Sequence, residues 1–356
     1  MNRSCILLLF ASLPLSSVGQ TPESSVDPGT LQRIYEEVKT PFKHGVILKG
    51  ESRDELVDCP SIFRHGDHWY MMYVAISNQI GYQTFLARSD DLLRWEKLGR
   101  ILSFTQPGDW DAWQADGGIA LCDPRWEGTH ELTGFDGKYW MSYIGGALQG
   151  YETDPLSIGL AWTTDPTAVR EWNRLRENPV LTPSQPDVRA FESRTLYKSQ
   201  IIHDEAETLG WPFVMYYNGK AKNGWERIGM AVSRDLVHWT RFGGEPVVVN
   251  GEAEQRGISG DPQIVRIGDV WTMFYFGAFW KPGAFDTFAC SRDLVHWTKW
   301  EGSPLIEPSE PFDETYAHKP WVLKWQGVVY HFYCAVGKEG RVIALATSRD
   351  LRLDRE

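Results

Sequence analysis

A short motif recurs along the 356-residue chain, and its spacing constrains the fold more than any other feature. The motif reads Ser-x-Asp-Leu-x-x-Trp and occupies residues 89–95, 233–239 and 291–297. Looser copies begin at residues 163 and 348, so five units follow one another at intervals of about 57–74 residues. A period of this size indicates a repeat architecture in which every unit supplies the same supersecondary structure.

A second motif, a short aromatic segment with high β-propensity, alternates with the first. Most copies follow a glycine turn, and each precedes another strand-like segment and then the polar motif. Helical periodicity is absent after residue 40. Four strands in each of five units predict an all-β fold over residues 50–356, a five-bladed β-propeller with four-stranded antiparallel blades. The five aromatic segments are residues 69–73, 139–143, 213–217, 271–275 and 329–333.

The N-terminal segment has the properties of a secretory signal followed by a leader. Residues 1–19 combine Arg3, an apolar stretch too short to cross a bilayer and a small-residue cleavage site. Residues 20–49 form the leader, in which residues 31–38 have helical spacing before a stop at Pro41. We therefore expect one short helix before the propeller, no transmembrane segment, and a secreted or periplasmic protein.

The charge balance is acidic, with 36 Lys and Arg residues against 47 Asp and Glu residues and a formal net charge of −11. Because proteins that bind nucleic acid or anionic membranes usually present a basic face, and no basic run occurs here, neither partner is expected. The chain is rich in aromatic residues, with 17 Trp, 14 Tyr and 16 Phe. Most of them belong to the repeats, and we expect Trp95, Trp239 and Trp297 to pack between blades.

Four cysteines remain after removal of the predicted signal: Cys59, Cys122, Cys290 and Cys334. Their spacing matches no zinc pattern. Two readings stay open, buried thiols that behave as small hydrophobic residues or one disulfide formed in an oxidising compartment. Neither the disulfide state nor the oligomeric state follows from the sequence.

One polar residue lies at the start of each predicted innermost strand. Alignment of the repeats places Asp58, Asp116, Glu192, Asp261 and His318 at equivalent positions. Because the innermost strands of a propeller line its central channel, we expect these side chains to gather on the axis. Clustered carboxyl groups acquire separated pKa values. Glycoside hydrolysis needs such a pair, one protonated acid and one ionised base or nucleophile.

These segments resemble glycoside hydrolase family 43, and the resemblance extends over residues 50–350. That family carries Asp-Pro-Ser in its first blade, Trp-Ala-Pro-Asp in its second and Glu-Gly-Pro in its third. The corresponding segments here are Asp-Cys-Pro-Ser at 58–61, Trp-Gln-Ala-Asp at 113–116 and Glu-Ser-Arg at 192–194. An axial His in the fifth blade of the family matches His318.

The resemblance implies an exported enzyme that hydrolyses plant or algal oligosaccharides, similar to arabinofuranosidases and xylosidases. By this resemblance Asp58 is the general base, Asp116 orients the acid and Glu192 is the general acid. The mechanism implied is inversion, with the working carboxyl groups about 6.5–9.5 Å apart. No cofactor is required; His318 would help to hold a central water or a metal ion, and a structural Ca²⁺ on the axis is compatible with the resemblance.

Departures from the family pattern keep other functions open. Glu192 lacks the following Gly-Pro, and Asp261 is an additional axial carboxylate, so an anhydrogalactosidase similar to family 117, with His318 as the acid, is one alternative. A phosphorylase similar to the mannoside phosphorylases is another, although Arg194 and Lys319 are the only obvious phosphate ligands. A propeller that binds sugars without cleaving them is the third alternative.

Specificity is expected in the loops above the axis, at residues 103–115, 145–156, 218–226 and 278–286, which match no known signature. The aromatic residues Trp113, Trp280 and Tyr316 are predicted to stack on sugar rings. Arg194, Asp261 and His318 complete the predicted substrate-binding set. Neither the sugar nor the choice between exo and endo action follows from the sequence.

Overall fold

The computed structural model describes residues 25–52, 54–250 and 257–351, and it is nearly all β-structure. The predicted signal, residues 1–19, lies outside this part. One helix, α1 (Pro28–Val38), precedes the sheets and confirms the expected short helix. The Asp27 side chain accepts a hydrogen bond from the backbone N–H of Thr30, which caps the helix. Its apolar face packs against the outside of the sheets.

The strands form four sheets, three of four strands and one of eight. The first four-stranded sheet contains β2 (Glu55–His65), β3 (His68–Ser77), β4 (Tyr82–Ser89) and β5 (Glu96–Leu102). The second contains β6 (Gln114–Ile119), β7 (Tyr139–Gly146), β8 (Leu156–Thr163) and β9 (Asn173–Arg174). The third contains β1 (Phe42–Leu48), β20 (Gly340–Thr347), β19 (Val328–Gly337) and β18 (Tyr316–Trp325).

The eight-stranded sheet is made of two antiparallel groups. The first group is β10 (Thr195–His203), β11 (Phe213–Lys220), β12 (Glu226–Ser233) and β13 (Trp239–Phe242). The second is β14 (Ile258–Ile267), β15 (Val270–Ala278), β16 (Ala284–Ser291) and β17 (Thr298–Lys299). A single parallel pair, Glu226 with Ile258, joins them.

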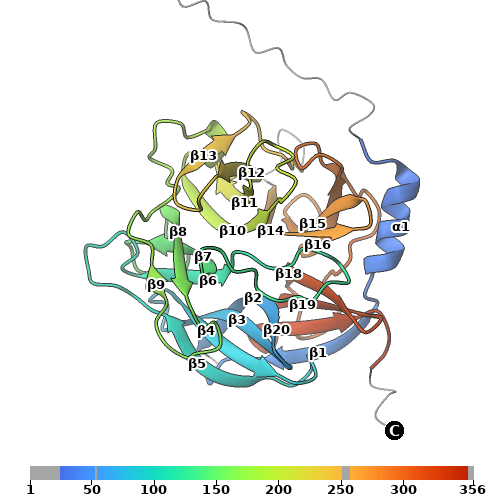
Figure 1. Cartoon of the computed structure of the whole chain (residues 1–356). Helices are drawn as coiled ribbons and strands as arrows, with labels where there is room; N and C mark the ends of the chain where they lie inside the picture. The colour runs from blue at the N-terminus through green and yellow to red at the C-terminus, as the bar shows by residue number, and fades with distance from the viewer. Residues whose placement is uncertain (1–24, 53, 251–256, 352–356) are drawn as a thin grey trace, which may run out of the picture.

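The sheets stand in a ring around a central axis, and the polypeptide follows the ring from blue to red in Figure 1. The strands β2, β6, β10, β14 and β18 contact one another in a closed circle at the centre. This propeller-like arrangement brings the starts of these inner strands together at one end of the axis and their ends together at the other.

The last sheet is closed by the N-terminal segment. Residues 42–48, which the sequence places in the leader, form β1 and pair with β20. The sheet domain therefore begins before residue 50, because the outer edge of β20 takes its backbone partners from this segment. Pairing between segments from the two ends of the sequence closes the ring without leaving that edge open.

The repeated polar motif forms the same turn each time. In the first copy Ser89 Oγ accepts from the N–H of Leu92, and Asp91 Oδ1 accepts from the N–H of Leu93 and Arg94. Leu92 has a φ of 66°, and the indole N–H of Trp95 donates to its carbonyl at 3.2 Å. The copies at 233–239 and 291–297 repeat these bonds, so the motif is structural.

The four cysteines of the described part are unpaired thiols. Three of them, Cys59, Cys290 and Cys334, are buried, in agreement with the reading as small hydrophobic residues. Within the described ranges no helix is long and apolar enough to cross a bilayer.

Candidate functional site

Irregularities in the inner strands turn polar side chains toward the axis. The pairing of β2, β14 and β18 with their neighbours shifts by a bulge after Asp58, Gly260 and His318. The next residue in each case, Cys59, Asp261 or Lys319, has a φ between 50° and 62°. The repeat alignment is corrected here: Asp261 corresponds to Cys59 and Lys319, and Asp58 corresponds to His318.

Asp58 is fully buried and surrounded by donors. Its Oδ2 accepts hydrogen bonds from Arg341 Nη1 at 2.7 Å, Lys319 Nζ at 2.9 Å and Tyr82 Oη at 3.3 Å. Burial disfavours the charged form, but Lys319 and Arg341 outweigh it and hold the pKa of Asp58 well below its usual range. Asp58 is therefore ionised at neutral pH.

Asp116 and Asp261 lie around the thiol of Cys59. The Sγ atom is 3.9 Å from Asp116 Oδ2 and 3.9 Å from Asp261 Oδ2, and Lys198 Nζ lies 2.5 Å from Asp116 Oδ1. Burial raises the pKa of both carboxyl groups, that of Asp261 to about 7. We call these residues, with Asp58 and Lys319, the axial cluster: Asp58, Cys59, Asp116, Lys198, Asp261 and Lys319. A cavity of about 40 Å³ lies beside four of them.

A second group of charged side chains surrounds the hydroxyl of Tyr197. Lys220 Nζ lies 2.8 Å from Tyr197 Oη, 3.6 Å from Glu226 Oε1 and 4.0 Å from Asp154 Oδ2. Burial raises the pKa of Tyr197, and the negative charges of Glu226, Glu152 and Asp154 raise it further. These five residues, Glu152, Asp154, Tyr197, Lys220 and Glu226, are called the outer cluster.

Lys319 connects the two clusters. Its Nζ atom is 2.9 Å from Asp58 Oδ2 and 3.3 Å from Glu152 Oε1. The carboxylate of Asp58 is completely buried, whereas the side chain of Glu152 is 21% exposed. Glu152 also has a φ of 46°, an uncommon conformation for a non-glycine residue. A strained backbone of this kind is typical of functional sites.

Glu192 does not join these clusters. It lies in a short 3₁₀ turn, η1 (Ala190–Glu192), and its Oε1 is 3.1 Å from Arg189 Nε and 2.5 Å from Arg241 Nε. Tyr217 Oη donates to Oε2 at 2.6 Å. Although burial opposes it, hydrogen bonding and charge from Arg189 lower the pKa of Glu192, with Tyr217 and Arg241 contributing. A lowered pKa is the opposite of what a general acid needs, so the acid role of Glu192 stays a prediction without geometric support.

His318 is buried beside the axis, but its ring faces protein groups. Its Nδ1 lies 3.1 Å from the carbonyl of Cys334, and its ring packs against Phe276 and Tyr316. Burial lowers the pKa of His318 to about 3, so it is neutral at physiological pH. Among the described residues, no group of three or more His, Cys, Asp or Glu side chains is arranged to hold a metal ion. The two lysines of the axial cluster supply positive charge at the axis instead.

The other predicted substrate contacts lie at the same end of the ring. Arg194 Nε is 2.6 Å from Asp154 Oδ2, and its side chain is 47% exposed. Trp113 packs against Phe104, and the indole N–H of Trp280 donates to the carbonyl of Ile258. Tyr316 is partly buried against the His318 ring. These three aromatic residues lie outside both clusters.

Three residues of this site were not identified from the sequence: Tyr151, Glu152 and Glu226. They lie in loops 145–156 and 218–226, which the sequence places above the axis. Tyr151 is 37% exposed, and the Arg341 guanidinium lies 5.3 Å from its ring centroid. The available signal was the presence of acidic and aromatic residues in those loops, because the blade motif itself does not contain them.

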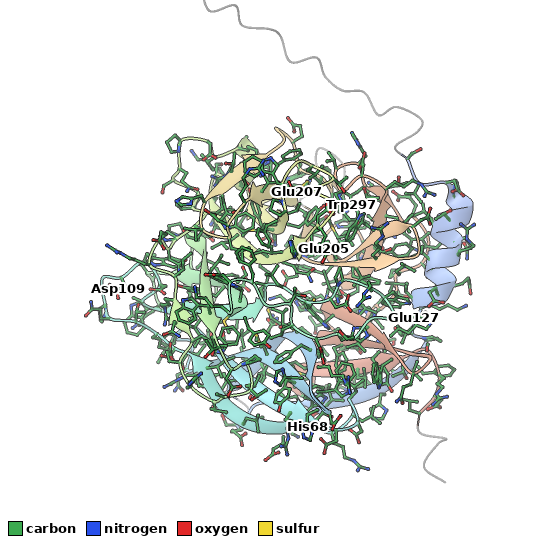
Figure 2. The ribbon with its side chains drawn as sticks, in the orientation of Figure 1. His68, Asp109, Glu127, Glu205, Glu207 and Trp297 are labelled. Atoms are coloured by element: carbon green, nitrogen blue, oxygen red, sulfur yellow. The ribbon has the colours of Figure 1, made fainter. Side chains whose placement is uncertain are left out.

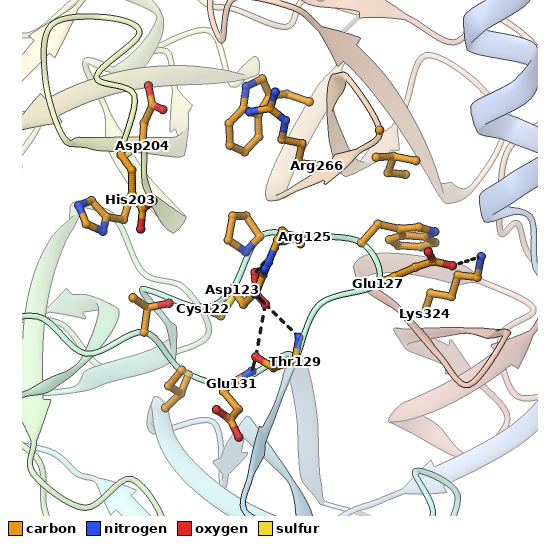
Figure 3. Close-up of a pocket in the computed structure, with 18 of the residues that line it drawn as sticks. Cys122, Asp123, Arg125, Glu127, Thr129, Glu131, His203, Asp204, Arg266 and Lys324 are labelled. Carbon is orange, nitrogen blue, oxygen red and sulfur yellow. Dashed lines mark hydrogen bonds and ion pairs between the residues drawn. The ribbon is translucent and has the colours of Figure 1, made fainter.

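The opposite end of the axis carries a cavity of about 1180 Å³ (Figure 3). The long connection between β6 and β7 crosses this end: the N–H of Trp126 donates to the carbonyl of Arg266, and the His130 ring contacts the carbonyl of Lys324. Glu127 and Glu205, labelled in Figure 2, are among the lining residues. Asp123 pairs with Arg125 there, and Glu127 with Lys324.

No family model matches the chain. Among curated proteins, an uncharacterised protein of Mycobacterium tuberculosis, Rv1502, is 26% identical over 72% of this chain and 81% of its own length. A 1,2-beta-oligomannan phosphorylase of a Thermoanaerobacter species is 32% identical over 38% of this chain. The match covers 46% of that phosphorylase, less than half of its length.

Solved structures match over most of the chain. A family-43 glycoside hydrolase and Zg3597, a family 117 glycoside hydrolase from Zobellia galactanivorans, are 14% and 12% identical with TM-scores of 0.59 and 0.62, which shows a shared fold. A complex of BT0996 with RGII and a structure named "Glycoside hydrolase" are each 44% identical, with a TM-score of 0.87. Each match covers 92% of this chain and 97% of the other. The chain therefore belongs to the glycoside hydrolases.

Proposed function

We propose that this glycoside hydrolase acts on an oligosaccharide of RGII, and that Glu152 and Glu226 are its working carboxyl groups. The observation that carries this assignment is their convergence around Tyr197, each beside a lysine that is shared with another acidic residue. The 44%-identical structure of BT0996 in complex with RGII supports the choice of substrate.

Access favours the outer cluster over the axial cluster. A general acid or base must come within about 2.6–3.2 Å of the atom with which it exchanges a proton. Asp58 and Asp116 are 0% and 1% exposed, and Asp58 already accepts three hydrogen bonds at one oxygen. We infer that Asp58 acts through Lys319, fixing the ammonium group that contacts Glu152.

The first experiment measures hydrolysis of RGII oligosaccharides by the wild-type protein and by Glu152→Gln and Glu226→Gln. We expect kcat to fall by about 10²–10⁴-fold in both variants. Azide added to the corresponding alanine variants separates the roles, because it restores turnover of an activated aryl glycoside only where the base or nucleophile was removed. Full activity in either glutamine variant contradicts the assignment.

The roles that the family-43 resemblance implies form the second candidate, with Asp58 as base, Asp116 as orienting residue and Glu192 as acid. Its test is Glu192→Gln, which abolishes turnover under this assignment and reduces only stability under ours. The implied inversion is tested by proton NMR of the first product formed. The opposite anomer is expected, and retention of configuration contradicts inversion.

The similarity to an oligomannan phosphorylase motivates one further control. Addition of inorganic phosphate should leave the rate and the products unchanged if water is the acceptor. Formation of a sugar phosphate would instead assign the protein to phosphorolysis.

We also propose that the ring has five blades, with the eight-stranded sheet counted as two blades joined at Glu226 and Ile258. The N-terminal residues 1–19 support export to the periplasm or the medium. N-terminal sequencing of the protein recovered after fractionation tests this proposal. A cytosolic protein that retains Met1 would contradict it.

A further inference from the structure

We propose that a second sugar subsite lies beside the outer cluster, in the cavity between the β1–β2 connection and the β19–β20 turn. The cavity has a volume of about 380 Å³, within the usual range of ligand pockets. Its occupant would be a neutral glycosyl unit of the oligosaccharide whose terminal bond is cleaved. The proposal rests on the proposed function and extends it to a longer substrate.

Arg341 joins this cavity to the site already described. Its Nη1 atom is 2.7 Å from Asp58 Oδ2, its guanidinium lies 5.3 Å from the Tyr151 ring centroid, and it also lines the cavity. Tyr151 precedes Glu152 in the sequence, so the same loop that carries the working carboxyl group extends toward the cavity. A chain of sugars with one unit at Glu152 therefore has a continuous path over Tyr151 to the second unit.

The charges around the cavity favour hydroxyl groups over a charged substituent. The cationic lining residues are Lys49, Lys338 and Arg341, and the acidic ones are Glu51, Glu55 and Glu339. Three positive and three negative side chains balance, so neither a carboxylate nor an ammonium group gains a net attraction. Ammonium groups donate and carboxylates accept hydrogen bonds, and vicinal sugar hydroxyls do both.

Two of the acids are already fixed in place. Lys97 Nζ lies 2.6 Å from Glu51 Oε1, and Glu55 Oε2 accepts from the backbone N–H of Glu51 at 2.6 Å. The cavity edge is thus partly ordered before a ligand arrives, which lowers the entropic cost of binding. Lys338 lies at the start of the β19–β20 turn and is the cation best suited for substitution, because it belongs to neither cluster.

The test is calorimetric binding of RGII oligosaccharides to the Glu152→Gln/Glu226→Gln double variant. Adding Lys338→Ala should weaken binding by about fivefold to tenfold, as expected for the loss of one or two hydrogen bonds. Lys338→Arg should retain most of the affinity. The matched control is Arg176→Ala, an exposed cation just after β9, which should leave the affinity unchanged.

The failures of the two proposals differ. Cleavage of the oligosaccharide by the wild-type protein together with unchanged binding in Lys338→Ala overturns the subsite alone. Absence of both cleavage and binding overturns the proposed function and the subsite with it. An equal loss of affinity in Lys338→Ala and Arg176→Ala also contradicts a local subsite, because it points to general attraction by charge.

Discussion

The two ends of the central axis carry similar kinds of side chain in different arrangements. At the starts of the inner strands, buried lysines are shared between carboxyl groups, as Lys319 is shared between Asp58 and Glu152. At the other end, the charged pairs are partly exposed: the Arg125 side chain is 71% exposed beside Asp123, and Glu127 is 70% exposed beside Lys324. The larger cavity is at this second end.

The difference teaches that cavity size does not locate the chemistry. Buried ions interact more strongly than exposed ones, because water no longer screens them. Such a network shifts pKa values and fixes side-chain positions, as catalysis requires. The exposed pairs of the far end are instead typical of a connection that holds neighbouring sheets together.

The largest effect is expected for Lys319→Met. The change leaves the buried carboxylate of Asp58 with one cation fewer, and breaking a buried ion pair costs about 3–5 kcal/mol. Urea unfolding should show this loss, and turnover should fall because Glu152 also loses its ammonium partner. A variant with wild-type stability and activity would remove the distinction between the two ends.

Glu226→Gln should have nearly as large an effect on turnover but a small effect on stability. The amide retains the shape of the carboxyl group and loses its proton chemistry, so kcat should fall by about 10²–10⁴-fold. Glu131→Gln, the same change in the lining of the far-end cavity, is the matched control and should remain fully active. Equal losses in the two variants would contradict the comparison.

The two ends should also differ in the direction of their pH dependence. The pKa of Asp261 is raised to about 7, so between pH 4 and 7 the folded protein holds a proton that the unfolded chain has lost. Stability therefore falls by roughly 2–4 kcal/mol as pH rises through this window, and Asp261→Asn should flatten the fall.

Asp123 should show the opposite slope. Burial opposes its charged form, but hydrogen bonds from Arg125 and Thr129 outweigh it and lower its pKa to about 2. Its stabilising contribution is complete above pH 4 and is lost as pH falls toward 2, and Asp123→Asn should remove that loss. Urea unfolding from pH 2 to 8 measures both slopes, and slopes of the same sign would contradict the assignments.

The smallest effect is expected for Glu127→Ala. Its pair with Lys324 is mostly exposed, and such pairs contribute about 0–1 kcal/mol. Thermal unfolding and turnover should both stay close to wild type. A loss of activity greater than about tenfold would show that the far end takes part in catalysis.

The fold follows from the sequence more directly than the site does. The repeated turn at Leu92 and Trp95 is local, because its hydrogen bonds join residues within one motif, and its spacing predicted the ring of sheets. The helix α1 was predicted for the same reason, from spacing and a stop at Pro41.

The site depends on contacts between segments far apart in the sequence. Asp58 was placed at the axis by the repeat, but its partners Lys319 and Arg341 come from the other end of the sequence. Glu192 occupies the expected position along the sequence, yet Arg189 and Arg241 hold its side chain elsewhere. No pattern within a single repeat encodes such pairings.

The most direct test of the central claim is a crystal structure of Glu226→Gln with an RGII oligosaccharide bound. We predict that the glycosidic oxygen lies within hydrogen-bonding distance of Glu152 or of the new amide at position 226, at the starts of the inner strands. A sugar bound with its glycosidic oxygen at Glu192, or in the cavity at the opposite end of the axis, would contradict the account.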